Sequence, residues 1–455
     1  MHFSLQEAVD ITEAGLVPDD AGGSFSRLLT DTREDCADGL FIAIAGEVYD
    51  AHDFLDKAVD ANAAALCIDR VKSSKLPANI KIPVLLVDDT VTAYQMLARE
   101  HKRRQENLKT IAVTGSMGKT STKEIIRAIL NAAFGNEAVL ATAGNLNNQI
   151  GVPKTLSGLE SGHRTAVIEA GTNHHGELKP LSKAIEPDVA VISSIGPCHL
   201  EFLGDLNGVA REKSAIFTYL KLDGTAIFPK DAPGIDIITS NADKFNVVTF
   251  GDSRDADVRG EYLGGNLNGS HIRLTLKDGT VIETDWPLTG KHQTLNAAAA
   301  AAAASAIGVP PEAIVEGLRQ VVLPGLRMRI SEHNGAAWVN DAYNASPGSV
   351  TAVLEWLSDF TDPEKCVLVL GDMLELGESE GESHREITAL AGKLFPGARI
   401  ISVGPRYQAC MAENILNFPD AAAAVDAVRD MVKAGDTVLL KGSRGMRLEQ
   451  IDPGY

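Results

Sequence analysis

Positive charge is the first thing this chain has little of. Its 455 residues include 42 Lys and Arg against 61 Asp and Glu, a formal net charge of −19 at pH 7. Phosphate backbones and anionic membranes are bound by basic surfaces, so this composition argues against a protein that binds nucleic acid or a membrane surface. Small polyanionic substrates remain open, because a few local cations or a metal ion are enough to hold them.

Cysteines and long apolar runs are also scarce. The five cysteines are an odd number without a CxxC pair, so the sequence signals neither a disulfide framework nor a zinc site. The most apolar run, residues 297–304, is eight alanines; it is too short to span a bilayer and predicts a tightly packed helix. We expect the cysteines to be small buried apolar residues: Cys36, Cys67, Cys198, Cys366 and Cys410.

The N-terminus lacks the features of a targeting segment. MHFSLQEAVDITEAG has neither the basic stretch nor the apolar core of a signal peptide. Its spacing of Leu, Ala, Val and Ile indicates a short amphipathic helix instead. The sequence therefore predicts a cytoplasmic protein without an integral membrane segment.

The elements that are present predict an α/β protein of three domains. Residues 1–105 mix β-rich runs with helical stretches, a small α/β domain that ends in the charged segment AYQMLAREHKRRQENL, expected to be a linker helix. Residues 106–323 alternate strand, glycine turn and helix, which indicates a central parallel sheet with helices on both faces. Polar alternation over residues 250–290 predicts antiparallel strands added to that sheet.

A third domain is expected over residues 324–455. It begins at a plausible hinge, Pro324 and Gly325. Four strand candidates follow, in AAWVND, KCVLVLGDM, ARIISVG and DTVLLKGS, and helical stretches separate them. This pattern is typical of a Rossmann-like domain.

A phosphate-binding loop is the strongest motif. The segment TGSMGKT follows an apolar strand and opens a helix, where backbone N–H groups and the helix dipole bind phosphate. Lys119 is expected to reach the terminal phosphates and Thr120 to bind Mg²⁺ through its hydroxyl. The motif can also be a glycine turn that happens to be followed by a lysine, with no phosphate-binding role. A kinase or GTPase is the stronger functional alternative. The expected ATP-binding residues here are Gly115, Ser116, Met117, Gly118, Lys119, Thr120 and Ser121.

Two further strands end in side chains that suit a metal site. Glu169 ends the strand in AVIEAG, and His199 follows the one in DVAVISSIG. Ligands of open α/β sheets lie outside the carboxyl ends of the strands, so both side chains can converge on the phosphate loop. Glu169 suits the hard Mg²⁺ ion, and His199 can be a second ligand. Taken singly, Glu169 can also be a capping residue and His199 a structural histidine.

Together these motifs resemble the Mur ligase family. From residue 110 onward the chain shows, in the order of that family, TGSMGKT, GNLNNQIGVPKT, EAGTNHHGEL, IGPCHLEFLG, GVAREKSAIF, HQTLNAAAA, DAYNASPGS, GDMLELG and LKGSRGMRLE. The N-terminal TDTREDCADGLFIAIAGEVYDAHDF is similar to the segment with which some members hold the UDP-sugar end of the substrate. GNLNNQIGVP, NHxGE and DAYNASP look most like the members that add D-alanyl-D-alanine to UDP-N-acetylmuramoyl-tripeptide.

The resemblance implies an ATP-dependent reaction and its domain roles. ATP would convert a substrate carboxylate into an acyl phosphate, and an amine would then displace phosphate, in peptidoglycan precursor synthesis. Residues 1–105 would bind the UDP-sugar precursor, residues 106–323 ATP, and residues 324–455 would complete the ligase site. Other muramyl-peptide ligases, folylpolyglutamate synthase and a non-ligase P-loop ATPase are the alternatives; the N-terminal domain disfavours the folate enzyme.

The resemblance also implies residue roles. It assigns Thr120 and Glu169 to one Mg²⁺, and His199 with Lys213, as a carbamate (N6-carboxylysine), to a second metal. Arg327, in PGLRMR where the family has PGRM, would act with Lys119 as a catalytic cation. Further ATP contacts would come from Asn145, His292, Asn296 and Asp341. Substrate contacts would come from Asp31, Thr32, Arg33, Asn173, His174, Asn344 and Ser346.

For three of these segments, the residues alone also allow a structural role without catalysis or ligand binding. Asp341 is a strand-end carboxylate of the kind that binds a ribose, yet it can also cap the following helix. Lys213 can be an exposed lysine paired with a nearby glutamate. The segment LLKGSRGMR can be a solvated turn after the last strand.

Overall fold

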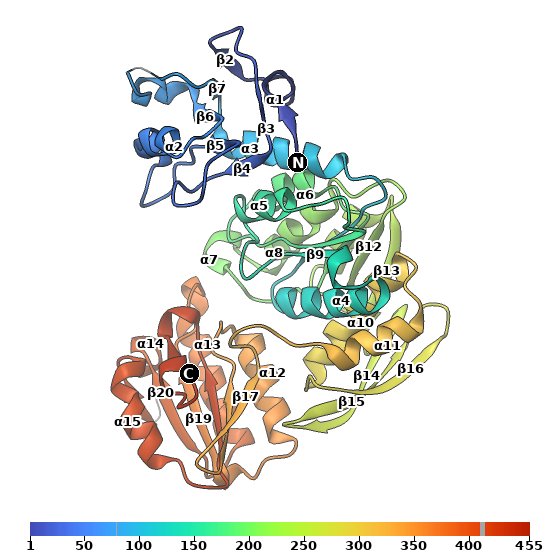
Figure 1. Cartoon of the computed structure of the whole chain (residues 1–455). Helices are drawn as coiled ribbons and strands as arrows, with labels where there is room; N and C mark the ends of the chain where they lie inside the picture. The colour runs from blue at the N-terminus through green and yellow to red at the C-terminus, as the bar shows by residue number, and fades with distance from the viewer. Residues whose placement is uncertain (79, 410–414) are drawn as a thin grey trace.

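The computed structural model describes residues 1–78, 80–409 and 415–455. Figure 1 shows three lobes that follow one another along the chain, each built around its own sheet. The three-domain α/β fold expected from the sequence is confirmed. None of the helices in these ranges has the length and apolar content that a bilayer crossing requires. Four of the cysteines are free and buried, as expected; Cys410 lies outside the described residues.

The N-terminal lobe contains a five-stranded sheet of order β2-β7-β6-β5-β4, in which only β2 runs antiparallel to its neighbour. A small β1–β3 pair lies beside it. The expected N-terminal helix is present because Ser4 and Glu7 form a capping box at its start. The elements are β1 (Phe3–Ser4), α1 (Leu5–Thr12), β2 (Gly15–Val17), β3 (Ser24–Phe25), β4 (Arg27–Leu29), β5 (Gly39–Ile42), α2 (Leu55–Asp60), β6 (Ala65–Asp69), β7 (Val84–Val87) and α3 (Thr90–Arg103).

Helix α3 is more than the charged linker that the sequence predicted. Its Ala93, Tyr94, Leu97 and Ala98 are buried, and it contacts α1 of its own lobe as well as α5 and α6 of the next. Its cations lie on the opposite side or reach across the boundary, as Arg103 does in pairing with a glutamate after α6. The helix therefore packs the first lobe onto the second.

The central lobe contains a nine-stranded sheet of order β16-β15-β14-β13-β12-β11-β8-β10-β9. Across the sheet from β9 to β14, with β8 among them, neighbouring strands pair in parallel. Strands β14, β15 and β16 pair antiparallel and form the extension predicted over residues 250–290. Its elements are β8 (Lys109–Thr114), α4 (Lys119–Phe134), β9 (Val139–Ala141), α5 (Gly151–Ser157), β10 (Thr165–Glu169), α6 (Leu178–Ile185), β11 (Val189–Ile192), α7 (Leu200–Leu203), α8 (Leu206–Ser214), β12 (Thr225–Pro229), α9 (Ile235–Ala242), β13 (Asn246–Gly251), β14 (Val258–Asn266), β15 (Gly269–Thr275), β16 (Val281–Trp286), α10 (Lys291–Ala306) and α11 (Pro311–Gln320).

The alanine run forms the centre of α10, and all eight alanines are buried. Methyl side chains allow close approach, so α10 packs tightly on α4 and β14. A Cβ on Gly260 of β14 would lie 3.2 Å from the Cβ of Ala298. This packing brings α10 beside the start of α4, where the phosphate loop ends.

The C-terminal lobe contains a six-stranded sheet of order β17-β18-β22-β19-β20-β21. The four strands expected from the sequence form its parallel centre, and β17 adds an antiparallel edge. Two edge strands, β17 and β21, were not predicted. The elements are β17 (Arg329–His333), β18 (Ala336–Asn340), α12 (Pro347–Ser358), β19 (Cys366–Gly371), the 3₁₀ helix η6 (Gly377–Ser379), α13 (Glu380–Leu394), β20 (Arg399–Val403), α14 (Pro405–Gln408), β21 (Leu416–Phe418), α15 (Ala421–Met431) and β22 (Thr437–Lys441).

Candidate active site

The phosphate loop joins β8 to α4, as the sequence predicted. Gly115 and Gly118 adopt positive φ angles of 147° and 79°, and a Cβ at either would meet Ser193 Oγ at 2.2 Å or Asn296 Oδ1 at 2.4 Å. Both positions therefore require glycine. The backbone N–H of Met117 donates to Ser194 Oγ at 2.8 Å, which fixes the loop to the end of β11.

The helix that follows the loop offers a phosphate site. The backbone N–H groups of Lys119, Thr120 and Ser121 in its first turn have no acceptor within the helix, and the helix dipole adds positive potential there. Lys119, the first helical residue, folds back so that its Nζ donates to Gly115 O at 2.7 Å. This is a weak and replaceable contact for an ammonium, so the lysine is available to a phosphate at the loop.

Glu169 and Thr120 meet at the next strand end. Thr120 Oγ1 donates to Glu169 Oε2 at 2.9 Å, and Asn147 Nδ2 donates to the other carboxylate oxygen at 2.8 Å. The Glu169 side chain is buried and does not cap a helix, so the capping alternative is wrong. Asn145, predicted as an ATP contact, is exposed in the same loop; Asn147, which the sequence did not single out, makes this contact with Glu169.

The oxygen atoms at this position fit Mg²⁺. In proteins Mg²⁺ keeps several waters and binds one or two protein oxygens together with substrate phosphates. The hydroxyl of Thr120 and the carboxylate of Glu169, 2.9 Å apart beside the phosphate loop, supply such protein oxygens. Within the described ranges no three His, Cys, Asp or Glu side chains gather into a metal-binding group. The site therefore suits an ion held jointly with a phosphate rather than one enclosed by protein.

Lys213 is fully buried on α8, so the exposed, glutamate-paired alternative is wrong. Among the described residues its Nζ donates to a single acceptor, Thr172 O, at 3.5 Å. The neighbouring Glu212 carboxylate is taken up by the backbone N–H groups of Gly176 and Leu178. Burial, and next the nearby positive charge of Lys119, lower the pKa of Lys213 from 10.5 to about 8. An amine with so few contacts is poorly stabilised as an ammonium ion.

His199 lies at the boundary with the C-terminal lobe. Its Nδ1 is 2.6 Å from Glu375 Oε2 of the loop after β19, and the histidine holds the pKa of Glu375 below its usual value. Both residues have positive φ angles, 50° and 64°. Such conformations are uncommon outside glycine and are found where the surrounding structure imposes them. The sequence did not identify Glu375.

Arg327 makes another contact between these lobes. Its Nη2 donates to Thr120 Oγ1 at 3.1 Å, and its guanidinium carbon lies 3.6 Å from the centre of the Tyr343 ring. The arginine of the PGLRMR segment is thereby brought to the phosphate loop, as the resemblance implied for a cation acting with Lys119. Stacking on the aromatic ring keeps the planar guanidinium group in a fixed orientation toward Thr120.

Asp341 follows β18 and does not cap α12, whose N-cap is Ser346; that alternative is wrong. Its carboxylate accepts from Lys441 Nζ at 2.5 Å and from the Met328 backbone N–H at 3.1 Å. Lys441 is buried, so the solvated-turn alternative fails for it, although Arg444 is exposed.

The two candidate base contacts come from α10. His292 is half-buried, its enclosed Nδ1 has no hydrogen-bond partner in the described part of the chain, and burial lowers its pKa to about 4. It is therefore neutral near pH 7. Asn296 is held by Gln293 and Thr122 and packs under Gly118 of the phosphate loop.

The remaining predicted substrate residues lie in loops. Asp31 and Arg33 pair with each other after β4, which lowers the pKa of Asp31 to about 2, and Thr32 lies between them. The backbone N–H groups of Asn173 and His174 both donate to the carboxylate of Glu177. Asn344 is exposed beside Tyr343.

Comparisons with known proteins agree with this geometry. Residues 113–304 match the model described as Mur ligase middle domain, and residues 326–444 match the one described as Mur ligase, glutamate ligase domain. The chain belongs to the Mur ligase family. The two matches cover the phosphate loop, Glu169, His199 and Lys213 on one side and Arg327 on the other.

Relatives of this Mur ligase extend over nearly the whole chain. The UDP-N-acetylmuramoyl-tripeptide–D-alanyl-D-alanine ligase of Bacillus subtilis is 36% identical over 93% of this chain and 91% of its own. The crystal structure of MurF from Acinetobacter baumannii superposes with a TM-score of 0.91 at 30% identity, over 99% of this chain and 98% of that one. MurF from Thermotoga maritima in complex with ADP gives 0.82 at 27% identity, over 93% and 96%.

Proposed function

We propose that this Mur ligase uses ATP to join D-alanyl-D-alanine to UDP-N-acetylmuramoyl-tripeptide, a step of peptidoglycan precursor synthesis in the cytoplasm. The observation that carries the proposal is similarity along the whole chain, the N-terminal lobe included, to relatives named for this reaction. We assign residues 1–105 to the UDP-sugar end of the precursor, 106–323 to ATP, and 324–455 to completion of the ligase site.

The proposed chemistry has two steps. A carboxylate oxygen of the tripeptide attacks the γ-phosphorus of ATP, and the bond from that phosphorus to the β,γ-bridging oxygen breaks. The products of this step are ADP and an acyl phosphate of the tripeptide. The free amine of the dipeptide then attacks the carbonyl carbon, phosphate departs, and the new amide nitrogen releases its proton. Several anions must be brought together in the first step, so catalysis depends on positioning and on positive charge.

This chain supplies that charge from both sides of the site. Lys119 and the N–H groups of α4 would hold the terminal phosphates, and Arg327 would add a third-domain cation beside Thr120. Mg²⁺, when bound, neutralises phosphate charge, and Thr120 and Glu169 would hold it. His199 and a carbamate on Lys213 would serve a second ion. Asp341 would accept from the ribose, and His292 and Asn296 would lie at the base.

A substrate-dependence assay tests the proposal. ADP release is measured with UDP-muramoyl dipeptide or tripeptide as acyl substrate and with single amino acids or D-alanyl-D-alanine as amine. We expect turnover only when ATP, the tripeptide precursor and the dipeptide are all present. Equal ATPase activity without an amine would reject the ligase in favour of a P-loop ATPase, and preference for a single amino acid would indicate a different muramyl ligase.

Closure of the C-terminal lobe gives the first prediction. His199–Glu375 and Arg327–Thr120 connect the lobes on either side of the Pro324–Gly325 linker, so both sides must meet for chemistry. A non-hydrolysable ATP analogue with UDP-tripeptide should make the protein more compact in small-angle scattering. An unchanged scattering profile would contradict closure.

Glu375→Gln tests the contact itself. The variant keeps the size of the side chain but removes the charge opposite His199, so we expect kcat to fall about 10-fold, since residues that orient a catalytic histidine typically matter at that level. Glu378→Gln is the matched control, because Glu378 is exposed in the same segment. Equal rates for the two variants would show that the Glu375 contact has no part in turnover.

A further inference from the structure

Phe202 is a large apolar side chain that the packing of the central lobe does not require. It lies on α7 with 41% of its surface exposed, whereas the next residue, Leu203, is buried. Its ring contacts the exposed ring of His174, with 4.1 Å between the ring centroids and 46° between the planes. We call Phe202 and His174 the aromatic pair. Its open side offers an apolar surface to a ligand.

Both members of the aromatic pair belong to segments that backbone hydrogen bonds hold in place. The N–H groups of Phe202 and Leu203 donate to His199 O at 3.0 Å and 2.9 Å. The N–H of His174 donates to the Glu177 carboxylate at 3.1 Å. The pair is therefore a preformed surface, and a ligand can bind to it without the cost of ordering a loop.

Hydrogen bonds also connect the Phe202 segment to the phosphate loop. Ser116 Oγ donates to Gly196 O at 3.0 Å and accepts from the Gly196 N–H at 3.0 Å. Cys198 Sγ donates to the same hydroxyl at 3.1 Å. His199 follows directly, and Phe202 lies three helical residues, or about 5 Å of helix rise, beyond it. The ring is therefore a near neighbour of the phosphate loop.

The His174 segment is attached to the other side of the candidate site. Lys213 Nζ donates to Thr172 O at 3.5 Å, and Thr172 is two residues before His174. Two residues of extended chain span at most about 7 Å. The aromatic pair consequently borders the space next to the phosphate loop, close to both His199 and Lys213.

The chemistry of the precursor brings one of its side chains to this space. The carboxylate that reacts with ATP belongs to the third and last residue of the peptide. In that residue a single atom separates the carboxyl carbon from the first side-chain carbon, so the two lie about 2.5 Å apart. A protein surface that borders the transferred phosphoryl group therefore also borders this side chain.

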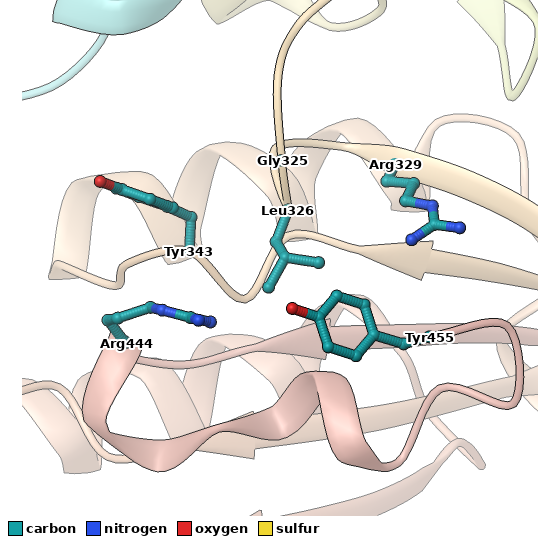
Figure 2. Close-up of a pocket in the computed structure, with 6 residues that line it drawn as sticks. All are labelled: Gly325, Leu326, Arg329, Tyr343, Arg444 and Tyr455. Atoms are coloured by element: carbon teal, nitrogen blue, oxygen red, sulfur yellow. The ribbon is translucent and has the colours of Figure 1, made fainter. Parts of the chain in front are cut away.

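The cavity beside the linker to the C-terminal lobe is a separate feature. It has a volume of about 430 Å³, and Figure 2 shows the residues around it. All of them belong to the C-terminal lobe and its linker, and none to the phosphate loop: Gly325, Leu326, Arg329, Tyr343, Arg444 and Tyr455. The aromatic pair, in contrast, belongs to the lobe that carries the phosphate loop.

We propose that Phe202, together with His174, binds the aliphatic part of the third-residue side chain of the tripeptide and favours precursors in which that side chain is long. The inference rests on the proposed function, since it supposes a tripeptide whose terminal carboxylate reacts. A long side chain buries its methylene groups on the ring, whereas the methyl group of alanine is too short to cover it. Phe202 is then a specificity-determining residue that the sequence did not single out.

The test compares UDP-muramoyl tripeptides that end in lysine or in alanine, by steady-state ADP release with ATP and D-alanyl-D-alanine at saturation. For the unaltered enzyme we expect KM to be about 10-fold higher for the alanine precursor, since lost hydrocarbon contacts have effects of this size. Phe202→Ala should raise KM for the lysine precursor by a similar factor and change kcat and KM for the alanine precursor little.

Two further variants make the test specific. Phe202→Leu keeps a hydrocarbon surface and should keep most of the preference for the lysine precursor. Leu222→Ala, at an exposed leucine of the same lobe, is the control and should leave the preference unaltered. Because the Phe202 ring is largely exposed, the melting temperature of Phe202→Ala should stay close to that of the control.

Three results would overturn the proposal: no preference in the unaltered enzyme, an unaltered KM for the lysine precursor in Phe202→Ala, or an equal rise in KM for both precursors. The last result would show that Phe202 supports the structure of the site without contacting the side chain. Failure of the proposed function is distinguishable, because the unaltered enzyme would then join the dipeptide to neither precursor.

Discussion

Lys119→Ala should lower kcat by about 10³-fold or more, because the lysine is placed to meet charge that develops on the transferred phosphoryl group. In the part of the chain that the structure describes, its ammonium has only carbonyl oxygens of its own loop as partners, Gly115 O at 2.7 Å and Ser116 O at 3.4 Å. An exchange of these for a phosphate is favourable, so the side chain contributes more to the reaction than to the fold. Steady-state ADP release with all three substrates measures the effect.

The fold should survive this substitution. Loss of the two carbonyl contacts costs about 1 kcal/mol of stability, so the melting temperature should change little. Lys183→Ala, at an exposed lysine on α6, is the control for removing a positive charge elsewhere. If Lys119→Ala keeps a rate close to that of the control, the phosphate loop does not serve phosphoryl transfer.

The sequence predicted the parts of the fold whose signals are local. The β8–α4 loop is recognisable because strand, glycines and Lys119 are adjacent in the chain, and the alanine run predicted α10 through propensity alone. Strands β17 and β21 were not predicted. Strand β17, RISEH, is polar and has no apolar run, and β21, LNF, has only three residues. Such edge strands are specified by their neighbours rather than by their own composition.

The site residues that were missed depend on contacts between distant segments. Among the asparagines of GNLNNQ, the loop conformation alone decides that Asn147 reaches Glu169. Glu375 was visible only as part of GDMLELG, because its partner His199 belongs to another lobe. Docking of whole lobes has no signature within a single segment. Correct roles at such positions require the three-dimensional arrangement.

Lys213 shows how burial changes the interpretation of one residue. Spacing on its helix favoured an exposed lysine, yet the side chain is fully buried and its Nζ has one acceptor among the described residues, at 3.5 Å. Lys123 is equally buried, but its Nζ is held by Glu124 and by Thr142 O at 2.8 Å. The Nζ of Lys123 therefore has close partners of opposite charge and polarity, which the Nζ of Lys213 lacks among the described residues.

The lowered pKa makes Lys213 suited to react with CO₂. Only the neutral amine forms a carbamate; with a pKa of about 8 roughly a tenth of the amine is neutral at pH 7, against about one part in 3,000 at the usual 10.5. The neutral fraction grows as pH rises toward 8, so carbamate formation should increase over that interval. ¹³C-labelled CO₂ should give a carbamate signal from the enzyme that is absent in Lys213→Arg, while Lys123 contributes none.

Ligase activity should require the carbamate on Lys213. The ammonium first loses a proton; the neutral amine nitrogen then attacks the carbon of CO₂ and loses a second proton, so a positive group would become an anion with two oxygens that can serve a metal ion. Lys213→Ala should be nearly inactive, by about 10²-fold or more, and partly rescued by a small carboxylate added to the assay. Lys213→Arg should be inactive and not rescued, because arginine keeps its positive charge and fills the space. Full activity in Lys213→Arg would refute the carbamate, since that side chain cannot form it.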